Sequence, residues 1–313
     1  MRLVFFGSPP FAEDSFGALL DSPHKPAALV TAPARRAGRG RKEALNPLAV
    51  AAAAADVPVL RPASTRAADF LAELAEFKPD LGVVVSYGQI LSDELLAIPR
   101  FGCINVHGSL LPRWRGASPV QAAILAGDSE SGVCVQKMVA KLDAGAVLAS
   151  RAIALSPDER AFELFERLKQ LGAKLLLEFL QEVGDGPVPE GEVQDENAVT
   201  ICKRIRPSDG RILWQQTSVQ VDRMVRAMAG WPWAQAQLPN GDMVRILRGE
   251  ASSFTPDGNG FQAGEIVRLN GGIFVHCDGG VFRIDELQRA GKAALPAAEF
   301  LRGCALKEGE ILT

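Results

Sequence analysis

The segment Cys103–Pro119 holds the densest set of side chains able to do chemistry, and at its centre are Asn105 and His107. The two residues end an apolar run, Gly102–Val106, that is typical of a buried strand. Because side chains alternate along a strand, Asn105 and His107 are predicted on the same side of the sheet. An amide can donate to an oxyanion and an imidazole can move a proton, so the pair could serve acyl transfer. On these residues alone, a structural role is the alternative.

The next residues form an unusual loop. Leu110–Pro112 is followed by Arg113, Trp114, Arg115 and Gly116. The leucines, the proline and the tryptophan could form one wall of a flat apolar pocket, with backbone groups free to bond a heteroaromatic ring. The alternative is a packed loop with its arginines in solvent.

A second segment, Lys141–Gly145, lies between two β-like runs. Asp143 precedes a small residue and a glycine, which is a turn signal. Locally, the sequence indicates a turn and nothing more.

The elements that must position these residues alternate along the first half of the chain. Short apolar runs separated by helical stretches predict a mostly parallel sheet with helices on both faces. Ligands of such sheets bind outside the carboxyl ends of the strands, where Asn105 and His107 are expected. The predicted strands are Leu3–Phe6, Ala27–Thr31, Val57–Leu60, Leu81–Val85 and Gly102–Val106, and the predicted helices are Phe11–Leu20, 46–55, Thr65–Phe77 and 158–183.

The pattern changes after residue 183. Residues 184–197 are rich in Gly, Pro and acidic residues, without periodicity, and indicate a linker. Beyond residue 207 come one short helix and several short strands with hairpin signals at Asn240-Gly241, 270–272 and 278–280. This predicts a small barrel or sandwich. We therefore expect a domain at 1–183, a linker at 184–207 and a C-terminal domain at 208–313.

Composition excludes several classes of protein. The net charge is −3, so the whole molecule is not a basic nucleic-acid coat. The 5 cysteines form no C-x-x-C pair and the 3 histidines are dispersed, which disfavours a disulfide framework and a structural zinc site. No apolar run approaches the roughly 20 residues of a membrane span. We expect a cytoplasmic protein.

Taken together, these segments resemble a known family. Asn105-x-His107, Ser109–Pro112, Arg115-Gly116 and Leu142-Asp143-x-Gly145 are similar to the signature of the folate-dependent formyltransferases. The resemblance extends over nearly the whole chain, from Val4–Pro9 through Tyr87–Leu91 and Asp209–Ile212 to the C-terminal strands. Four residues depart from the family's usual pattern, namely Ser92, Gly108, Lys141 and Ala146.

The resemblance carries expectations about fold, activity and site. It implies an α/β domain with a doubly wound, mostly parallel sheet, followed by a small OB-like β-barrel. It implies formyl transfer from 10-formyltetrahydrofolate, a cosubstrate, to an amino group, with no metal. Asn105, His107 and Asp143 would be catalytic. The folate would lie against Ser109, Leu110, Leu111, Pro112, Gln89, Ile90 and Leu91.

A basic segment suggests the acceptor. Residues 35–42 hold five basic residues in eight, and such a loop can contact a phosphate backbone. A solvated charged loop is the alternative. The segment resembles the loop with which family members that act on initiator methionyl-tRNA hold its acceptor end, and Arg39 matches the key arginine there. Arg36, Arg41 and Lys42 are further candidates, the C-terminal domain would also contact tRNA, and the resemblance implies a monomer.

Other readings of the same residues differ in the acceptor. A nucleotide-linked amino sugar could take the formyl group, although such an enzyme would not need the basic loop. Glycinamide ribonucleotide is a weaker candidate because it leaves the last hundred residues unexplained. A hydrolase would use the same three residues with water. A non-catalytic tRNA-binding protein would have no use for all three.

Overall fold

The computed structural model describes residues 1–33, 36–37, 42–43 and 46–313. The chain divides into two compact units. The first comprises Met1–Pro119, Glu130–Ala154 and Phe165–Cys202, and the second comprises Val120–Ser129, Leu155–Leu164 and Lys203–Thr313. Among the described residues, no helix is both long and apolar enough to cross a membrane.

A seven-stranded sheet forms the centre of the first unit, in the order β10-β9-β7-β6-β1-β2-β5. The strands β5, β2, β1, β6 and β7 run parallel, β9 runs antiparallel to them, and β10 runs antiparallel to β9 and so in the same direction as β7. The two central strands are continuous apolar runs buried along their whole length, as expected of strands covered on both faces. The strand bounds are β1 Leu3–Gly7, β2 Ala28–Val30, β5 Val59–Leu60, β6 Leu81–Val85, β7 Cys103–His107, β9 Glu130–Lys137 and β10 Val147–Ala154.

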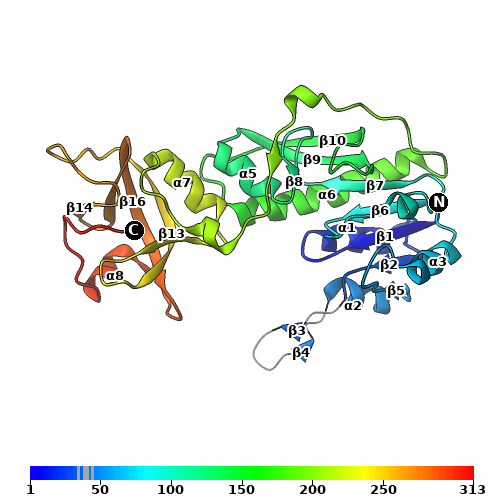
Figure 1. Cartoon of the computed structure of the whole chain (residues 1–313), viewed down its shortest axis with the longest axis horizontal. Helices are drawn as coiled ribbons and strands as arrows, with labels where there is room; N and C mark the ends of the chain where they lie inside the picture. Colours follow the sequence, from blue (N-terminus) through cyan, green and yellow to red (C-terminus); the bar gives the residue numbers. More distant parts are fainter. Residues whose placement is uncertain (34–35, 38–41, 44–45) are drawn as a thin grey trace. The chain divides into compact units, whose positions relative to one another are not determined.

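Helices cover both faces of this sheet, so the predicted doubly wound α/β arrangement is confirmed (Figure 1). On one face, Phe16 of α1 (Ala12–Leu20) stacks on Phe5, and Gly172 of α6 (Ala161–Val183) lies against Val106. On the other face, Phe70 and Leu74 of α3 (Ala68–Glu76) and Leu95 of α4 (Asp93–Leu96) share one core cluster with Cys103. Since Cys103 alternates with Val106 along β7, Asn105 and His107 lie on the face turned away from α6.

Helix α2 (Pro47–Ala54) begins as the sequence predicts. The Asn46 side chain caps it by accepting from the Leu48 N–H at 3.0 Å, and Pro47 occupies the first turn. Two short pairs complete the first unit. Strand β8 (Arg115–Gly116) pairs with β11 (Ile201–Cys202), and β3 (Arg36–Ala37) pairs with β4 (Lys42–Glu43).

The second unit contains an antiparallel sheet in the order β12-β13-β16-β15-β14, with β17 also paired to β16. All three predicted hairpin turns join neighbouring antiparallel strands, which confirms the predicted β-rich C-terminal part. Its elements are α7 Ser218–Ala227, β12 Ala234–Gln237, β13 Met243–Ser252, β14 Ile266–Leu269, β15 Ile273–Cys277, β16 Gly280–Arg289, β17 Ala294–Pro296 and α8 Ala297–Arg302. α5 (Pro119–Ala126), apart from its first residue, also belongs to this unit.

The C-terminal residues connect the two edges of this sheet. Ile266 and Gly264 at the start of β14 exchange hydrogen bonds with Glu310 and Leu312. Thr313 exchanges two more with Gln237 of β12. The edge strands are thereby joined through one segment, as expected of a small closed barrel.

Candidate active site

Strand β7 presents Asn105 and His107 together at its carboxyl end. Asn105 lies opposite Gln136 of β9, and His107 lies opposite Cys134. The predicted placement of both side chains on one face is therefore present. His107 is buried, with 6% of its surface exposed, whereas Asn105 is partly exposed and its side chain forms no hydrogen bond with the described residues. The Asn105 amide is thus available to donate to a ligand.

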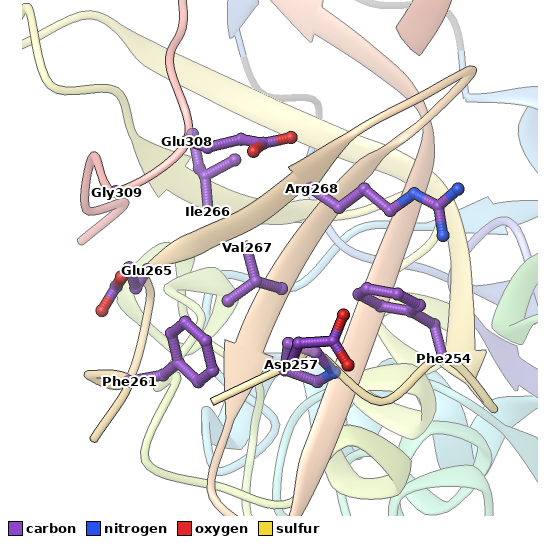
Figure 2. A pocket seen from close by; sticks show the side chains of 10 residues that line it. Phe254, Asp257, Phe261, Glu265, Ile266, Val267, Arg268, Glu308 and Gly309 are labelled. Carbon is purple, nitrogen blue, oxygen red and sulfur yellow. The ribbon is translucent and has the colours of Figure 1, made fainter. Parts of the chain in front are cut away.

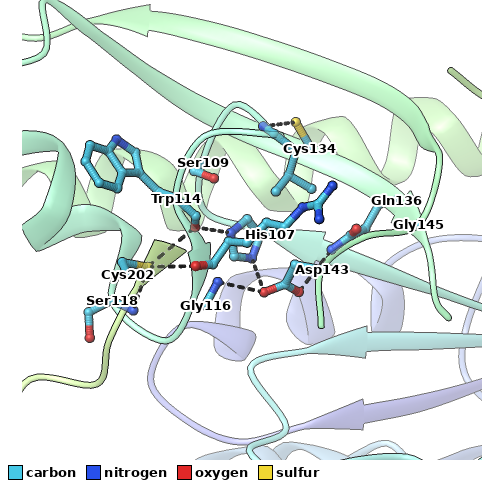
Figure 3. A network of polar contacts seen from close by, with 12 residues as sticks. His107, Ser109, Trp114, Gly116, Ser118, Cys134, Gln136, Asp143, Gly145 and Cys202 are labelled. Carbon is cyan, nitrogen blue, oxygen red and sulfur yellow. Dashed lines mark hydrogen bonds and ion pairs between the residues drawn. The ribbon is translucent and has the colours of Figure 1, made fainter. Parts of the chain in front are cut away.

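Asp143 lies beside the His107 ring, although it follows His107 by 36 positions in the chain. Its Oδ2 is 3.8 Å from His107 Nδ1 (Figure 3). On the far side of the ring, Nε2 lies 3.0 Å from the Trp114 carbonyl oxygen. A carbonyl only accepts hydrogen bonds, so Nε2 carries a proton. The other ring nitrogen, Nδ1, faces the Asp143 carboxylate.

Two donors fix the Asp143 carboxylate. The Gly116 N–H donates to Oδ2 at 2.9 Å, and Gln136 Nε2 donates to Oδ1 at 3.1 Å. The backbone around it is tightly held as well. Asp143 has φ 48°, a region that favours glycine and tolerates Asp, and a Cβ added at Gly145 would lie 1.7 Å from the Lys137 carbonyl oxygen. The segment that the sequence predicts as a simple turn is a tightly packed loop that fixes the orientation of the Asp143 carboxylate.

The loop after β7 is held both by its own residues and by neighbouring strands. Ser109 Oγ donates to the Arg113 carbonyl at 2.6 Å, and the Leu111 N–H points to Cys134 Sγ at 3.4 Å. Leu110, Leu111 and Pro112 are partly exposed, as a pocket wall requires. Arg115 is buried at 3% exposure, unlike the solvated arginine of the alternative reading.

The other predicted folate residues follow β6, the parallel neighbour of β7, so both loops leave the same edge of the sheet. Gln89 is partly exposed and Ile90 is 74% exposed, while Leu91 is buried in the core below. The Ile90 carbonyl already accepts from Thr65 Oγ1 at 2.9 Å. Ser92, a departure from the family pattern, caps α4 by accepting from the Leu95 N–H.

The predicted tRNA-binding residues fall partly outside the described structure. Arg39 and Arg41 lie outside the described residues. Arg36 and Lys42 belong to β3 and β4, which pair in antiparallel register.

Four contributors to the site were not predicted: Gln136, Gln194, Thr200 and Cys202. Gln136 is a polar residue at the end of an apolar run, which is only a weak sign of a functional position. In the structure it lies opposite Asn105. The other three lie in the segment predicted as a linker, where no local pattern marks them. Thr200 Oγ1 accepts from the Trp114 N–H at 2.8 Å.

Cys202 packs against the backbone of β8. Its Sγ lies 3.4 Å from the carbonyl oxygens of both Trp114 and Arg115. Burial raises the pKa of the Cys202 thiol, and the nearby Asp143 charge adds to the rise. Cys202 therefore remains a thiol that can donate, and it supports the loop.

The part of the chain that the structure describes contains no group of three or more metal-binding side chains. A pocket of about 430 Å³ in the second unit is lined by Phe254, Phe261 and Arg268, among others (Figure 2). Arg268 there lies over the Phe254 and Phe274 rings, at 4.8 and 5.8 Å.

An amide and an imidazole with a carboxylate partner, at the carboxyl edge of an α/β sheet, suit acyl transfer to a nucleophile. Residues 1–180 match the Formyl transferase family, and residues 204–305 match the Formyl transferase C-terminal domain. The fold and the site therefore define a formyl transferase.

Relatives specify the family further. The chain is 42% identical over 306 residues to "Methionyl-tRNA formyltransferase" of Methylococcus capsulatus, covering 98% of each chain. It is 38% identical to the protein of that name from Paramagnetospirillum magneticum, covering 100% of both. This chain belongs to the methionyl-tRNA formyltransferase family.

A solved structure shares the fold. The N-formyltransferase from Helicobacter canadensis, in complex with folinic acid and dTDP-3-aminofucose, superposes with a TM-score of 0.67 at 18% identity. The match covers 92% of this chain and 99% of that one.

Proposed function

We propose that this chain transfers the formyl group of 10-formyltetrahydrofolate to the α-amino group of initiator methionyl-tRNA. The supporting observation is the set of Asn105, His107 and Asp143 at the carboxyl end of β7, in a chain that matches methionyl-tRNA formyltransferases from end to end. We expect the protein to act as a monomer in the cytoplasm, where its tRNA substrate is found.

The reaction exchanges one carbon–nitrogen bond for another. The free α-amine adds to the formyl carbon, and the carbonyl oxygen becomes an oxyanion. The bond from that carbon to the folate N10 then breaks, and the proton lost by the amine ends on N10. The protein must stabilise the oxyanion and help to move this proton.

The site residues divide this work. Asn105 donates its amide N–H to the oxyanion, since no described residue occupies that donor. His107 takes up a proton at Nδ1, because Nε2 is already bonded to the Trp114 carbonyl. Asp143, held by Gly116 and Gln136, stabilises the imidazolium so formed.

The folate would lie along the loops after β6 and β7. Leu110, Leu111 and Pro112 offer partly exposed apolar surface, and Ile90 is an exposed apolar side chain on the neighbouring loop. A pterin ring needs such an apolar wall with a few polar groups. Because the Ser109 hydroxyl is engaged by the Arg113 carbonyl, we expect Ser109 to shape this wall rather than to donate to the ligand.

The assay that tests the function supplies 10-formyltetrahydrofolate and measures formylmethionine on charged initiator tRNA. Parallel reactions contain a dTDP-linked amino sugar or no amine, and an Asn105→Ala variant serves as the site control. Formylmethionine made by the wild type and nearly absent in the variant is the expected result. Formylation of the sugar instead, or release of formate to water, would retain the site and overturn the acceptor.

A further inference from the structure

Gln194 has a buried side chain whose amide forms three hydrogen bonds beside Asp143. It is 7% exposed and lies between α6 and β11. Its Nε2 donates to the carbonyl oxygens of Asp143 and Gly145, at 2.8 and 2.7 Å. Its Oε1 accepts from Arg115 Nε at 3.0 Å. Both donor hydrogens of the amide and one lone pair of its oxygen are therefore used on this site.

These contacts close a ring that begins and ends at Asp143. The Asp143 carbonyl binds Gln194, Gln194 binds Arg115, and Arg115 is followed by Gly116, whose N–H binds the Asp143 carboxylate at 2.9 Å. Gln194 therefore holds both the backbone that carries Asp143 and the residue next to its main anchor. The Asp143 backbone has φ 48°, a conformation that surrounding contacts must maintain.

The neighbouring carboxylate Glu196 supports the same ring from outside. It accepts from Lys141 Nζ at 2.6 Å and from Arg115 Nη2 at 2.9 Å. The hydrogen bonds from Lys141 and Arg115 lower the Glu196 pKa. Glu196 is 59% exposed, and exposed ion pairs contribute little. The buried amide of Gln194 is the stronger constraint.

We propose that Gln194 is a positioning residue for the reaction, which fixes the Asp143 carboxylate relative to His107. Its kinetic consequence rests on the proposed function. A displacement of about 1 Å in such a group can cost on the order of 100-fold in rate. Gln194 touches no reacting atom, so its effect passes through Asp143.

The first test compares Gln194→Glu with Gln194→Ala and with Gln170→Ala, a change at an exposed glutamine of α6. Gln194→Glu keeps an acceptor for Arg115 but loses both donors to the loop. Both Gln194 variants should lose about 10- to 100-fold in kcat, with KM for the folate changed less than about threefold. Gln170→Ala should behave as the wild type. Wild-type kinetics in Gln194→Glu would overturn the proposal.

A double-mutant cycle separates positioning from general loss of structure. In an Asp143→Asn background, adding Gln194→Glu should reduce kcat by less than about threefold further, since the two residues act as one unit. A full additional loss would show that Gln194 does not act through Asp143, and would overturn the proposal.

A third readout does not depend on activity. The ¹⁵N resonances of the His107 imidazole should move in Gln194→Glu and stay in place in Gln170→Ala. Unchanged His107 resonances in Gln194→Glu would overturn the positioning role. If the wild type failed to formylate methionyl-tRNA, the proposed function would fall, and this spectrum would still decide the role of Gln194.

Discussion

At the scale of single residues, the Asn105 amide has the most direct consequence for rate. Replacing it with alanine removes one oxyanion donor and should lower kcat by about 10²- to 10³-fold. Stability should change little, because the Asn105 side chain is partly exposed and forms no hydrogen bond with the described residues. Single-turnover formylation with Asn259→Ala, an exposed asparagine of the second unit, as control measures this. Near-normal turnover would refute the donor role.

The cysteines give a second residue-scale prediction. Burial raises the pKa of Cys103 and Cys277 to about 12 and that of Cys134 to about 11, and it also raises the pKa of Cys202. Because a thiolate is the reactive form, native protein at pH 8 should be alkylated at the partly exposed Cys304. Unfolded protein should react at all five cysteines. Mass spectrometry after iodoacetamide treatment measures this, and rapid native alkylation of Cys202 would contradict its burial.

The residues of the site were predictable to different degrees. The placement of Asn105 and His107 on one face followed from strand alternation, because both belong to one short run, whereas their catalytic role came from the family resemblance. Asp143 needed the family resemblance, since the local sequence indicates only a turn. Gln194 was not predicted, because its contacts to Asp143 and Gly145 join positions about fifty residues apart.

At the scale of elements, the short β8–β11 pair gives a prediction about stability. Gly116 has φ +121°, and a Cβ there would lie 2.2 Å from the Cys202 carbonyl oxygen. Gly184 has φ +61° with nothing near a Cβ. Both Gly→Ala variants carry backbone strain, of about 1 kcal/mol or more. Only Gly116→Ala adds a clash with backbone, so it should be clearly less stable in urea unfolding and nearly inactive. Equal stability of the two variants would contradict the tight packing of β8 on β11.

Elements with a strong local signal were predicted well. The start of α2 at Asn46-Pro47 and the glycine-containing hairpins of the second unit are specified by residues within the turn or cap itself. Strands β8 and β11 are two residues long and have no alternation to read. Their pairing depends on tertiary contacts, which propensity and pattern do not contain.

At the scale of the whole molecule, the two compact units are not continuous in sequence. Val120–Ser129 and Leu155–Leu164 belong to the unit that otherwise begins at Lys203. Composition and linker signals are read along the chain, so they predict boundaries such as 183 and 208. They cannot predict that a segment of ten residues within the first domain belongs to the second unit. The family matches, at 1–180 and 204–305, follow the linear order in the same way.

The net charge of the whole molecule bears on how it would bind tRNA. A net charge of −3 gives no general attraction for a polyanion, so binding must rely on local basic residues. Arg39, outside the described residues, is the strongest candidate by resemblance. Arg39→Ala should lower kcat/KM for methionyl-tRNA and reduce the slope of its logarithm against log salt by about one unit.

The control for this prediction removes the same charge elsewhere. Arg66→Ala alters an exposed arginine of the first unit and should leave the slope unchanged. Kinetics measured from low to physiological salt separate a lost phosphate contact, which changes the slope, from a change of net charge, which both variants share. If Arg39→Ala and Arg66→Ala had the same salt dependence, residues 35–42 would not contact tRNA phosphates, and the tRNA-binding residues would lie elsewhere in the chain.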